Sequence, residues 1–465
     1  MNFVLINPPD KDNRKIMRNF DCATESKGNY LYQPYDFLLL SSKIKEEHLT
    51  FYDCIAEGIS KEKLFENFNT LRPNPMFIIS IAQTSYAQDQ IFINEVKEMF
   101  PDSLIIVFGD IFFDQFIEEE LINSVDLILS DPFTIDLYKT YEIGKDQAAL
   151  LELEGVWHKE VYNRSDLKAP KKFSITSPLH SSFLNKSYRW PFSRYFKYTT
   201  VFTAWGCPYS CSYCIMKRFP NVYRDADEII EELKIIKNQN IREIYIGDRS
   251  FGLPRNNIIS LLNKMILNKF NFSWSTYFHP NQYDPELLNL MKQSGCHTVI
   301  IGIESSDIEF LKNFGRHTKK DKLSALISHA KELGISICGD FIIGLPGQSY
   351  QEVLKTIDLS INLDIDYASF NVAAPLPGSS IRENAIKSGQ INKDFRGVDS
   401  LGKTGGLDSD QLTHEQIIEL RNLAVRRFYL RPTYLLKRIS KIRGIQHFWI
   451  QFQEGYELFK KSLKV

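Results

Sequence analysis

The chain has 465 residues, a hydrophobic share of 43%, a charged share of 24% and a formal net charge of −1. This length predicts two or three domains, and the composition is typical of globular proteins. A net charge near zero excludes a strong overall attraction to nucleic acid or to an anionic membrane, although it is compatible with a local basic patch.

The N-terminus and the cysteine content indicate where the protein works. No apolar run is long enough to span a bilayer, and residues 1–9 lack the basic start and long apolar core of a signal peptide. The seven cysteines form an odd number, which argues against a disulfide framework in a chain of this length. We therefore expect a cytoplasmic protein with neither a membrane span nor a nucleic-acid partner.

Residues 1–145 alternate apolar runs with helix-like stretches, which is the pattern of a parallel sheet covered on both faces. The pattern predicts a doubly wound, Rossmann-like domain. Residues 146–195 mix charge, proline and aromatic residues without periodicity, so we expect a connecting segment packed on the surface of its neighbours. In the first domain, candidate strands cover 3–6, 77–81, 104–108 and 127–129, and candidate helices cover 89–99 and 113–122.

The strand–helix rhythm returns over residues 196–400 with a longer repeat. Six βα units in succession predict a partial (β/α)6 barrel of the TIM type, whose function belongs at the C-terminal ends of the strands. Residues 401–465 are expected to form a helical region. The six candidate strands cover 199–203, 243–246, 272–276, 298–303, 335–343 and 367–372.

Several helix boundaries in this second domain are marked in the sequence. Asp284 before Pro285 is typical of an N-cap followed by proline at the first helical position. Asp225 with Glu228 predicts a capping box, and Thr318 is expected to open a further helix.

Three of the seven cysteines lie within eight residues, at Cys207, Cys211 and Cys214. Thiolates at this spacing on a loop can converge on one soft metal centre, and an incomplete ligand set leaves room for a substrate. The alternatives are a zinc knuckle or a chance grouping. Zinc usually takes a fourth Cys or His at short range, whereas His180 and His279 are far away in sequence.

The motif Cys-x-x-x-Cys-x-x-Cys, with the aromatic Tyr213 before its last cysteine, resembles the signature of the radical S-adenosylmethionine (SAM) superfamily. The resemblance implies a 4Fe–4S cluster held by the three cysteines, with one iron free to bind SAM. It also implies reductive cleavage of SAM to a 5′-deoxyadenosyl radical, while the protein orients the partners and excludes water and oxygen.

Further segments match this superfamily in chain order behind the cysteines. The turn after the second strand resembles the one that binds the amino group of SAM, the end of the fourth strand resembles a ribose-contacting segment, and residues 339–347 resemble the segment beside adenine. The cofactor-binding residues implied in this way are Tyr213, Gly247, Asp248, Glu304, Ser305 and Gly344. No catalytic residue is singled out.

A doubly wound domain ahead of such a barrel resembles the cobalamin-binding branch, the group named after the anaerobic magnesium-protoporphyrin ester cyclase. The chain departs from the usual cobalamin contacts, since it has no Asp-x-His-x-x-Gly motif. It carries Gly109-Asp110 where relatives have two glycines, and Ser130-Asp131 where they have Gly-Glu. The domain is therefore either a cobalamin binder with altered contacts or a scaffold.

The sequence thus favours a radical SAM enzyme that acts on a small-molecule metabolite and draws on a one-electron reductant such as flavodoxin or ferredoxin. With cobalamin, methyl transfer to an unactivated carbon is expected. Without it, the alternatives are a cyclase or epimerase with a degenerate N-terminal domain, or a non-catalytic zinc- or cluster-stabilised binding protein. Cys296 and Cys338 are expected to be small core residues.

Overall fold

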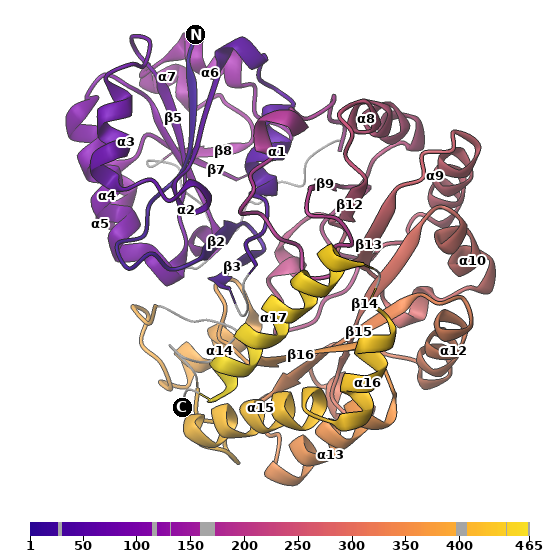
Figure 1. Ribbon diagram of the computed structural model, residues 1–465. Coiled ribbons are helices and arrows are strands. Elements are labelled where there is room, and N and C mark those ends of the chain that lie inside the picture. Colours follow the sequence, from indigo (N-terminus) through magenta and orange to yellow (C-terminus); the bar gives the residue numbers. More distant parts are fainter. Residues whose placement is uncertain are drawn as a thin grey trace.

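The computed structural model describes residues 1–26, 30–113, 119–130, 132–158, 173–396, 407–442 and 444–463. Two six-stranded sheets lie side by side with helices around them (Figure 1). No helix in this described part combines the length and apolar character needed to cross a bilayer.

The first sheet has the strand order β4-β1-β5-β6-β7-β8, in which all pairings are parallel except that of β7 with β8. The strands of the predicted first domain are confirmed, but β4 and β8 were not predicted. β8 lies within the predicted connecting segment and closes the sheet as an antiparallel edge. The strands are β1 (Phe3–Asn7), β4 (Leu49–Asp53), β5 (Met76–Ser80), β6 (Ile105–Phe108), β7 (Leu127–Leu129) and β8 (Val156–His158).

Helices pack on both faces of the first sheet, because its central strands are apolar on both sides. Every residue of β1, β5 and β6 is buried, which matches the continuous apolar runs in the sequence. The helices are α1 (Tyr35–Ser41), α2 (Cys54–Glu57), α3 (Lys61–Phe68), α4 (Tyr86–Met99), α5 (Glu119–Ser124), α6 (Leu137–Ile143) and α7 (Gln147–Leu150). Part of the predicted helix at 113–122 lies outside the described residues.

The second sheet is entirely parallel and keeps the strands in chain order, β9-β12-β13-β14-β15-β16. All six predicted strands are present, with bounds shifted by a few residues. Figure 1 shows α8, α9, α10 and α12 along the outer side of this sheet. The strands are β9 (Tyr198–Val201), β12 (Glu243–Ile246), β13 (Ser273–Tyr277), β14 (Cys296–Glu304), β15 (Ser336–Ile343) and β16 (Tyr367–Val372).

The two sides of the second sheet differ in chemistry, because successive side chains of a strand point to opposite faces. Ile337 and Phe341 of β15 face outward into the core beneath the helices, whereas Cys338 and Asp340 face inward. The helices are α8 (Ala226–Asn238), α9 (Arg255–Leu267), α10 (Pro285–Gln293), α11 (Ile308–Lys312), α12 (Lys320–Glu332), α13 (Tyr350–Asn362) and α14 (Ser380–Lys387).

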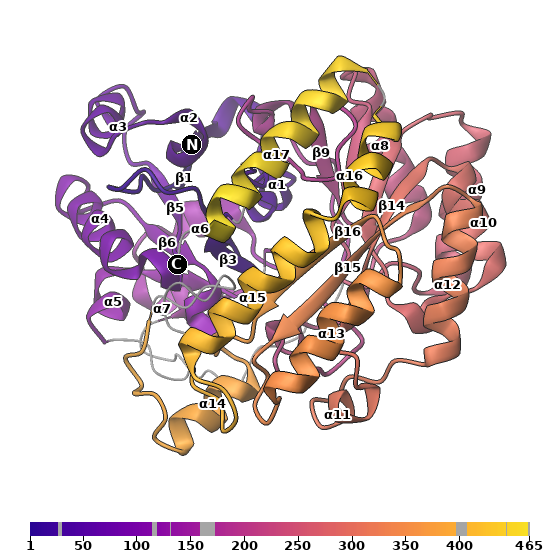
Figure 2. The same ribbon diagram turned by 60° about the horizontal axis from the view of Figure 1, so that its bottom comes forward.

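The predicted C-terminal helical region is present as α15 (His414–Tyr429), α16 (Pro432–Ser440) and α17 (Ile445–Leu463). Figure 2 shows these helices crossing in front of β15 and β16. They therefore cover the side of the second sheet that the βα repeats leave open.

Two of the predicted helix caps need correction. Asp284 caps α10 and Asp225 caps α8 as expected, but Glu228 does not complete a capping box. Its carboxylate instead accepts a hydrogen bond from the Ser174 hydroxyl at 2.7 Å. Likewise α12 begins after Lys319, without a side-chain cap from Thr318.

The connecting segment is not a surface layer, and this prediction was wrong for its described second half. Trp190 is buried on the inner side of the second sheet, where its ring stacks on Tyr245 at 3.8 Å. Its indole N–H donates to the Ser275 hydroxyl at 2.8 Å. The aromatic residues of this segment therefore fill the interior of the second sheet.

Gln33 joins the two sheets by satisfying the open edge of β9. Its amide oxygen accepts from the Thr200 backbone N–H at 2.8 Å, and its amide nitrogen donates to the Phe183 carbonyl at 2.9 Å. The Gln33 backbone N–H donates to the Tyr198 hydroxyl at 2.9 Å. The side chain thus replaces the neighbouring strand that an edge strand lacks.

Replacement of Gln33 by alanine tests this junction. The change would leave the Thr200 N–H and the Phe183 carbonyl buried without a partner, and each orphaned group costs about 1–3 kcal/mol. We expect the free energy of unfolding to fall by about 2–4 kcal/mol in urea denaturation. The matched change Gln351→Ala, at an exposed position of α13, should alter it by less than about 0.5 kcal/mol. Equal effects would contradict this role of Gln33.

Candidate functional site

The three clustered cysteines lie on a loop at the C-terminal end of β9. The loop lies between the short strands β10 (Ala204–Trp205) and β11 (Val222–Tyr223), which pair antiparallel. Gly206 has a φ of 86°, and a Cβ there would lie 2.1 Å from the Pro220 carbonyl oxygen. Only glycine fits this position, because both its φ and the close approach of the opposite chain exclude a side chain.

Contacts from distant parts of the chain hold the loop in place. The Ser212 N–H donates to the Phe314 carbonyl at 2.9 Å, and the Ser212 carbonyl accepts from the Ser380 N–H at 2.8 Å. Cys207 and Cys214 pack against an apolar cluster that includes Trp205. The loop is therefore positioned by the turn after α11, by α14 and by the interface between the domains.

The three thiols are neighbours and are largely withdrawn from solvent. Burial raises the pKa of all three, that of Cys214 to about 12, and each thiol also lies near another of the set. Three soft sulfur donors gathered on one partly covered loop fit the ligand set of an iron–sulfur cluster. Among the described residues, no group of three or more His, Cys, Asp or Glu side chains is arranged to hold a single metal ion.

A buried pair of opposite charge, Glu304 and Arg316, lies beside Cys211. Glu304 ends β14 with a φ of 66°, in the left-handed region, and its carboxylate is 4.0 Å from the Arg316 guanidinium. Burial raises the pKa of Glu304, and burial together with Glu304 and Cys211 raises that of Tyr213. Gly302 leaves the space for this pair, because a Cβ there would lie 2.3 Å from the Glu304 carboxylate. Three of the predicted site residues, Cys211, Tyr213 and Glu304, are therefore brought together.

Asp248 is buried and serves the cysteine loop directly. Its carboxylate accepts from the Thr203 N–H at 2.8 Å, from the Ala204 N–H at 3.1 Å and from the Thr203 hydroxyl. Burial raises its pKa to about 6. Gly247 packs on the Phe202 ring, where a Cβ would lie 2.5 Å from the ring carbons. In this structure both residues position the strand that leads into the cysteines.

The other two predicted residues have contacts with the helical layer. The Ser305 hydroxyl accepts from the Asp307 N–H at 3.2 Å and lies 3.4 Å from the Thr356 hydroxyl of α13. Gly344 has a φ of 84° and lies against Ile417 of α15. Both therefore shape the strand ends beside the site through their own packing.

Sequence reasoning missed a histidine beside the cysteine loop. His279 stacks on Tyr209 with 3.9 Å between ring centroids, and its Nδ1 accepts from the Asn281 N–H at 3.1 Å. Burial and the nearby Arg316 lower the pKa of His279 to about 2, so the ring is neutral and Nε2 carries the proton. This Nε2 and the Arg316 Nε are buried without a hydrogen-bond partner among the described residues. Both are donors available to a bound group.

Arg249 is a second residue that the sequence did not single out. It contacts the first domain, because it forms an ion pair with Asp21 and its Nη2 donates to the Tyr35 hydroxyl at 2.8 Å. Its guanidinium lies 5.5 Å from the Tyr277 ring centre, and its positive charge offsets a small part of the rise that burial causes in the pKa of Cys207 and Cys214. Its position directly after Asp248 was the only available signal.

The C-terminal edge of the first sheet is filled by a hairpin of β2 (Ile16–Asn19) and β3 (Cys22–Glu25). Arg18 of this hairpin is buried, forms an ion pair with Asp89 at 2.9 Å and donates to the Asn7 side chain at 2.8 Å. Phe20 packs on Phe108 at 5.0 Å and on Phe219 of the cysteine loop at 6.2 Å. Aromatic packing thus joins the two domains at this edge.

The predicted departures from cobalamin contacts have structural roles here. A Cβ at Gly109 would lie 1.8 Å from the Ile81 carbonyl oxygen, so this glycine is required by the protein's own backbone. Asp110 is buried, accepts from the Gln83 N–H at 3.1 Å, and has its pKa raised to about 7 by burial. Asp131 lies outside the described residues. The described residues at this edge therefore make structural contacts with one another.

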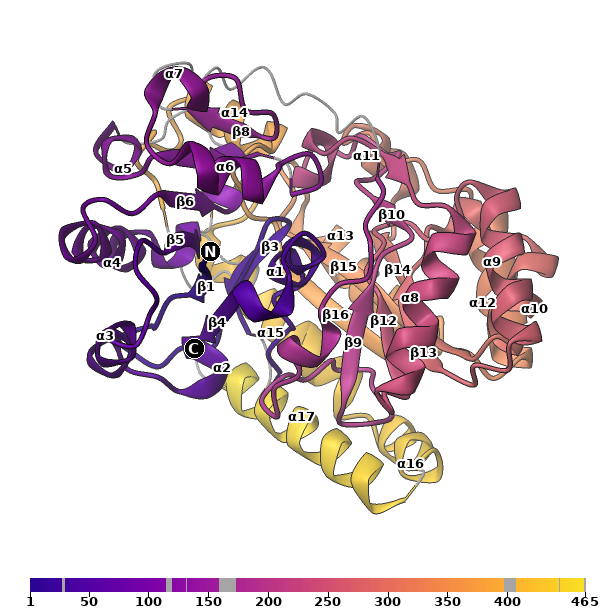
Figure 3. The same cartoon turned by 90° about the horizontal axis from the view of Figure 1, so that it is seen from above.

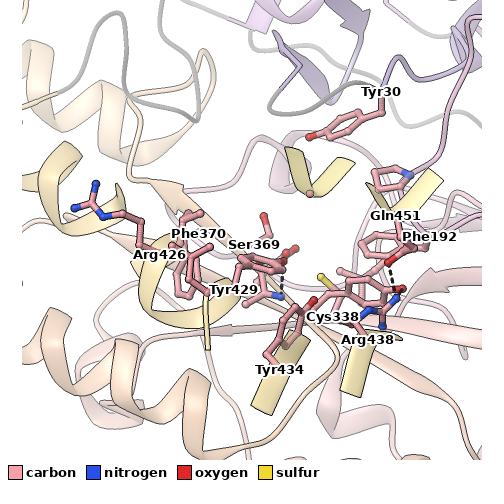
Figure 4. A pocket seen from close by; sticks show the side chains of 18 of the residues that line it. Tyr30, Phe192, Cys338, Ser369, Phe370, Arg426, Tyr429, Tyr434, Arg438 and Gln451 are labelled. Carbon is pink, nitrogen blue, oxygen red and sulfur yellow. Dashed lines mark hydrogen bonds between the residues drawn. The ribbon is translucent and has the colours of Figure 1, made fainter. Parts of the chain in front are cut away.

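A cavity of about 350 Å³ lies on the inner side of β14, β15 and β16, beneath the C-terminal helices (Figure 4). Its volume falls in the range of small-molecule sites. Its wall is mainly aromatic, with three arginines and one aspartate. The residues that define it best are Tyr30, Phe192, Tyr277, Ile300, Cys338, Asp340, Tyr367, Ser369, Arg421, Arg426, Tyr429, Tyr434, Arg438 and Gln451.

Comparison with known protein families agrees with this geometry. The model of the radical SAM superfamily matches residues 203–360, which begin just before the cysteine loop and continue through β15. Residues 203–360 therefore form a radical SAM domain.

Curated relatives include an uncharacterized methyltransferase of Pyrococcus horikoshii, 32% identical over 249 residues, which cover 52% of this chain and 54% of the relative. The bacteriochlorophyllide d C-12(1)-methyltransferase of Chlorobaculum tepidum is 26% identical, over 49% of this chain and 53% of that protein. The anaerobic magnesium-protoporphyrin IX monomethyl ester cyclase of Cereibacter sphaeroides is 21% identical, over 70% and 55%. The chain spans about half the length of these relatives.

Solved structures show the same α/β fold. The radical SAM methyltransferase TsrM from Kitasatospora setae, with cobalamin and a [4Fe–4S] cluster bound, superposes with a TM-score of 0.64 at 16% identity, covering 99% of both chains. The cobalamin-dependent SAM radical enzyme OxsB superposes with a TM-score of 0.63 at 15% identity, over 99% of this chain and 71% of that one. The fold thus resembles cobalamin-dependent radical SAM enzymes in both of its parallel-sheet parts.

Substitution of Asp248 tests its role in holding the cysteine loop. Asp248→Ala would leave the Thr203 and Ala204 N–H groups buried and unpaired, so we expect a loss of about 2–4 kcal/mol in the free energy of unfolding. Asp248→Asn keeps an acceptor for both groups and should lose less. If Asp248→Ala unfolds like the wild type, the loop does not depend on this carboxylate.

The pH dependence of stability distinguishes the aspartate from its isostere. Because burial raises the pKa of Asp248 from 3.8 to about 6, its contribution is largest below pH 3.8 and falls as the pH rises through 6. We therefore expect the wild type to lose stability relative to Asp248→Asn over this window in denaturation curves. A constant difference between the two proteins would contradict the raised pKa.

Loading of an iron–sulfur cluster should depend on pH through the cysteines. The thiols must lose their protons to bind iron, and burial raises their pKa values. We expect anaerobic reconstitution to release protons and to become more complete from mildly acidic to mildly alkaline pH, as measured by iron and sulfide content. Cys211→Ser is the control, which should remain poorly loaded throughout. Loading that does not change with pH would contradict the raised pKa values of the three thiols.

Proposed function

We propose that this protein is a radical SAM enzyme that transfers a methyl group to an unactivated carbon of a small-molecule substrate. The observation that carries the proposal is the cysteine loop itself: three thiols on one fixed loop, with Tyr213, Glu304 and Arg316 beside them, inside the segment that matches the superfamily. The methyltransferase relatives support the reaction class.

Cys207, Cys211 and Cys214 would hold a 4Fe–4S cluster, and the incomplete set of ligands would leave one iron for SAM. When bound, the cluster supplies the electron that cleaves SAM to a 5′-deoxyadenosyl radical. The chain's part is to hold the three sulfurs in an apolar setting. The packing of Cys207 and Cys214 against the interdomain cluster supports this role, since it keeps water away from them.

The predicted cofactor residues would surround SAM at the C-terminal ends of β12, β14 and β15. Glu304 and Arg316 are a buried pair of opposite charge beside Cys211, which suits the charged groups of SAM. The Arg316 Nε and the His279 Nε2 are the buried donors for such a group. Tyr213, Gly247, Asp248, Ser305 and Gly344 would complete the site by positioning these strand ends.

We further propose that the second sheet is a partial (β/α)6 barrel whose inner cavity receives the substrate. Ile300 in the cavity and Glu304 at the cofactor site both belong to β14 and lie four residues apart, which in a strand is about 13 Å. Asp340 in the cavity lies in β15, and Gly344 follows directly after the end of this strand. The aromatic wall favours a planar or largely apolar substrate.

A second candidate is a cobalamin-free radical enzyme such as a cyclase or epimerase. The specific observation that favours it is the filled edge of the first sheet, where the β2–β3 hairpin and Phe20 lie and where Gly109 contacts Ile81. Anaerobic incubation with hydroxocobalamin, followed by gel filtration and a visible spectrum, distinguishes the two candidate functions. Retention of a stoichiometric corrinoid spectrum supports the methyltransferase, and its absence supports the cobalamin-free enzyme.

As partners we propose a one-electron donor, such as flavodoxin or ferredoxin, and a small-molecule substrate in the cytoplasm. The need for a reductant follows from the superfamily.

Substitution of one cluster cysteine tests the proposed function. Anaerobically reconstituted wild type should form 5′-deoxyadenosine from SAM and a strong reductant, because reductive cleavage proceeds even without the natural substrate. We expect Cys211→Ser to lower this rate by at least about a hundredfold. Cys296→Ser is the matched control, since this buried thiol lies at the opposite end of β14 and should leave the rate within about twofold.

Two results would overturn the proposal. One is wild-type protein that binds zinc in place of iron after purification without oxygen. The other is equal formation of 5′-deoxyadenosine by the wild type and Cys211→Ser.

A further inference from the structure

The last two helices expose an unusually apolar surface. On α16, Leu436 and Ile439 are 69% and 65% exposed, and α17 carries aromatic side chains that are about half exposed. The α17 residues recur at the spacing of one helical face. We call this surface the C-terminal stripe, formed by Leu436, Ile439, Ile445, Phe448, Trp449, Phe452 and Tyr456.

The stripe faces away from the protein, because the opposite sides of the same helices cover the cavity. Tyr434 of α16 is buried against β16, where its hydroxyl donates to the Asp366 carbonyl at 3.0 Å. Arg438 donates to the Tyr367 hydroxyl at 2.7 Å, and Gln451 of α17 lines the cavity beside it. Figure 3 shows α16 and α17 together at one edge of the molecule. The two helices therefore have an inner side that covers the cavity and an outer side that forms the stripe.

The charge of this region differs from that of the rest of the chain. Residues 431–465 carry eight Lys and Arg and only two Asp and Glu, in a chain whose formal net charge is −1. Lys437 and Lys441 form ion pairs with Asp364 and Asp366, whereas Lys460 is exposed on α17. The segment that carries the C-terminal stripe therefore has six more basic than acidic residues in its sequence (eight minus two).

We propose that α16 and α17 dock the protein on the surface of an anionic lipid bilayer. A helix that is apolar and aromatic on one side and basic around it lies in the membrane interface, where Trp, Tyr and Phe enter the headgroup layer and Lys and Arg meet anionic lipid. The helices would lie on the bilayer and not cross it, which agrees with the lack of a spanning helix in the described chain.

Charge favours a bilayer over a second copy of the chain. A symmetric dimer through this stripe would bring together two segments that each carry a net positive charge, which is unfavourable. An anionic bilayer neutralises the same charge and at the same time receives the apolar side chains. The inference does not depend on the proposed radical chemistry, because it rests on the exposed face of the helices alone.

Trp449 provides a direct optical test. It is 51% exposed, whereas Trp157, Trp190, Trp205 and Trp274 are at most 9% exposed. We expect vesicles of phosphatidylglycerol and phosphatidylcholine to shift the tryptophan emission of the full-length, cluster-loaded protein to shorter wavelength. Vesicles of phosphatidylcholine alone should have a much smaller effect, and Trp449→Phe should abolish the shift without preventing flotation.

Flotation with the same vesicles measures the contribution of the stripe. We expect Phe448→Gln/Phe452→Gln to weaken partitioning to the anionic vesicles by about tenfold or more. The matched control Ile91→Gln/Leu267→Gln removes two side chains that are 57% and 78% exposed elsewhere, and it should bind like the wild type. Circular dichroism and the rate of 5′-deoxyadenosine formation should be unchanged in both variants.

Three results would overturn the inference. The first is failure of the wild type to bind anionic vesicles at low salt. The second is equal weakening by the stripe variant and its control. The third is a wild-type dimer that becomes monomeric in the stripe variant with no vesicle binding by either protein, which would assign the surface to a second copy of the chain.

Discussion

Desolvation of three thiols on one loop is the constraint on which the rest of this structure depends. Burial raises the pKa of Cys207, Cys211 and Cys214, because it disfavours the charged thiolate. The protein must therefore hold the three thiols where a bound group can stabilise their charged form. Asp248 fixes the strand that enters the loop, and the Phe314 carbonyl and the Ser380 N–H fix its middle. The loop is thus built from several distant parts of the chain.

The two sheets work as one unit because their contacts converge near this loop. Gln33 completes the edge of β9, Asp21 pairs with Arg249 directly after Asp248, and Phe20 packs on Phe219. A change at the edge of the first sheet would therefore reach the thiols through packed aromatic and charged groups. This gives the N-terminal domain a physical role in the site whether or not it also binds a corrinoid.

The C-terminal helices connect the interior of the second sheet with the outer surface. Their inner side chains, such as Tyr434 and Arg438, cover an aromatic cavity, and their outer side chains form an apolar stripe. If this stripe rests on a bilayer, the cavity lies directly above the lipid surface. A planar, apolar substrate would then have only a short path from the membrane to the site.

The sequence alone predicted the two parallel sheets, the radical SAM domain and the loop of clustered cysteines, because continuous apolar runs between helical stretches and a local spacing of thiols are written in neighbouring residues. It could not place Trp190 inside the second sheet, pair Glu304 with Arg316, or set His279 against Tyr209. Those contacts join residues that are far apart in sequence, and only tertiary packing decides which of them meet. The roles of Asp248 and Gly109 were also decided there, since burial against Thr203 and Ile81 gives each a structural partner that no local pattern reveals.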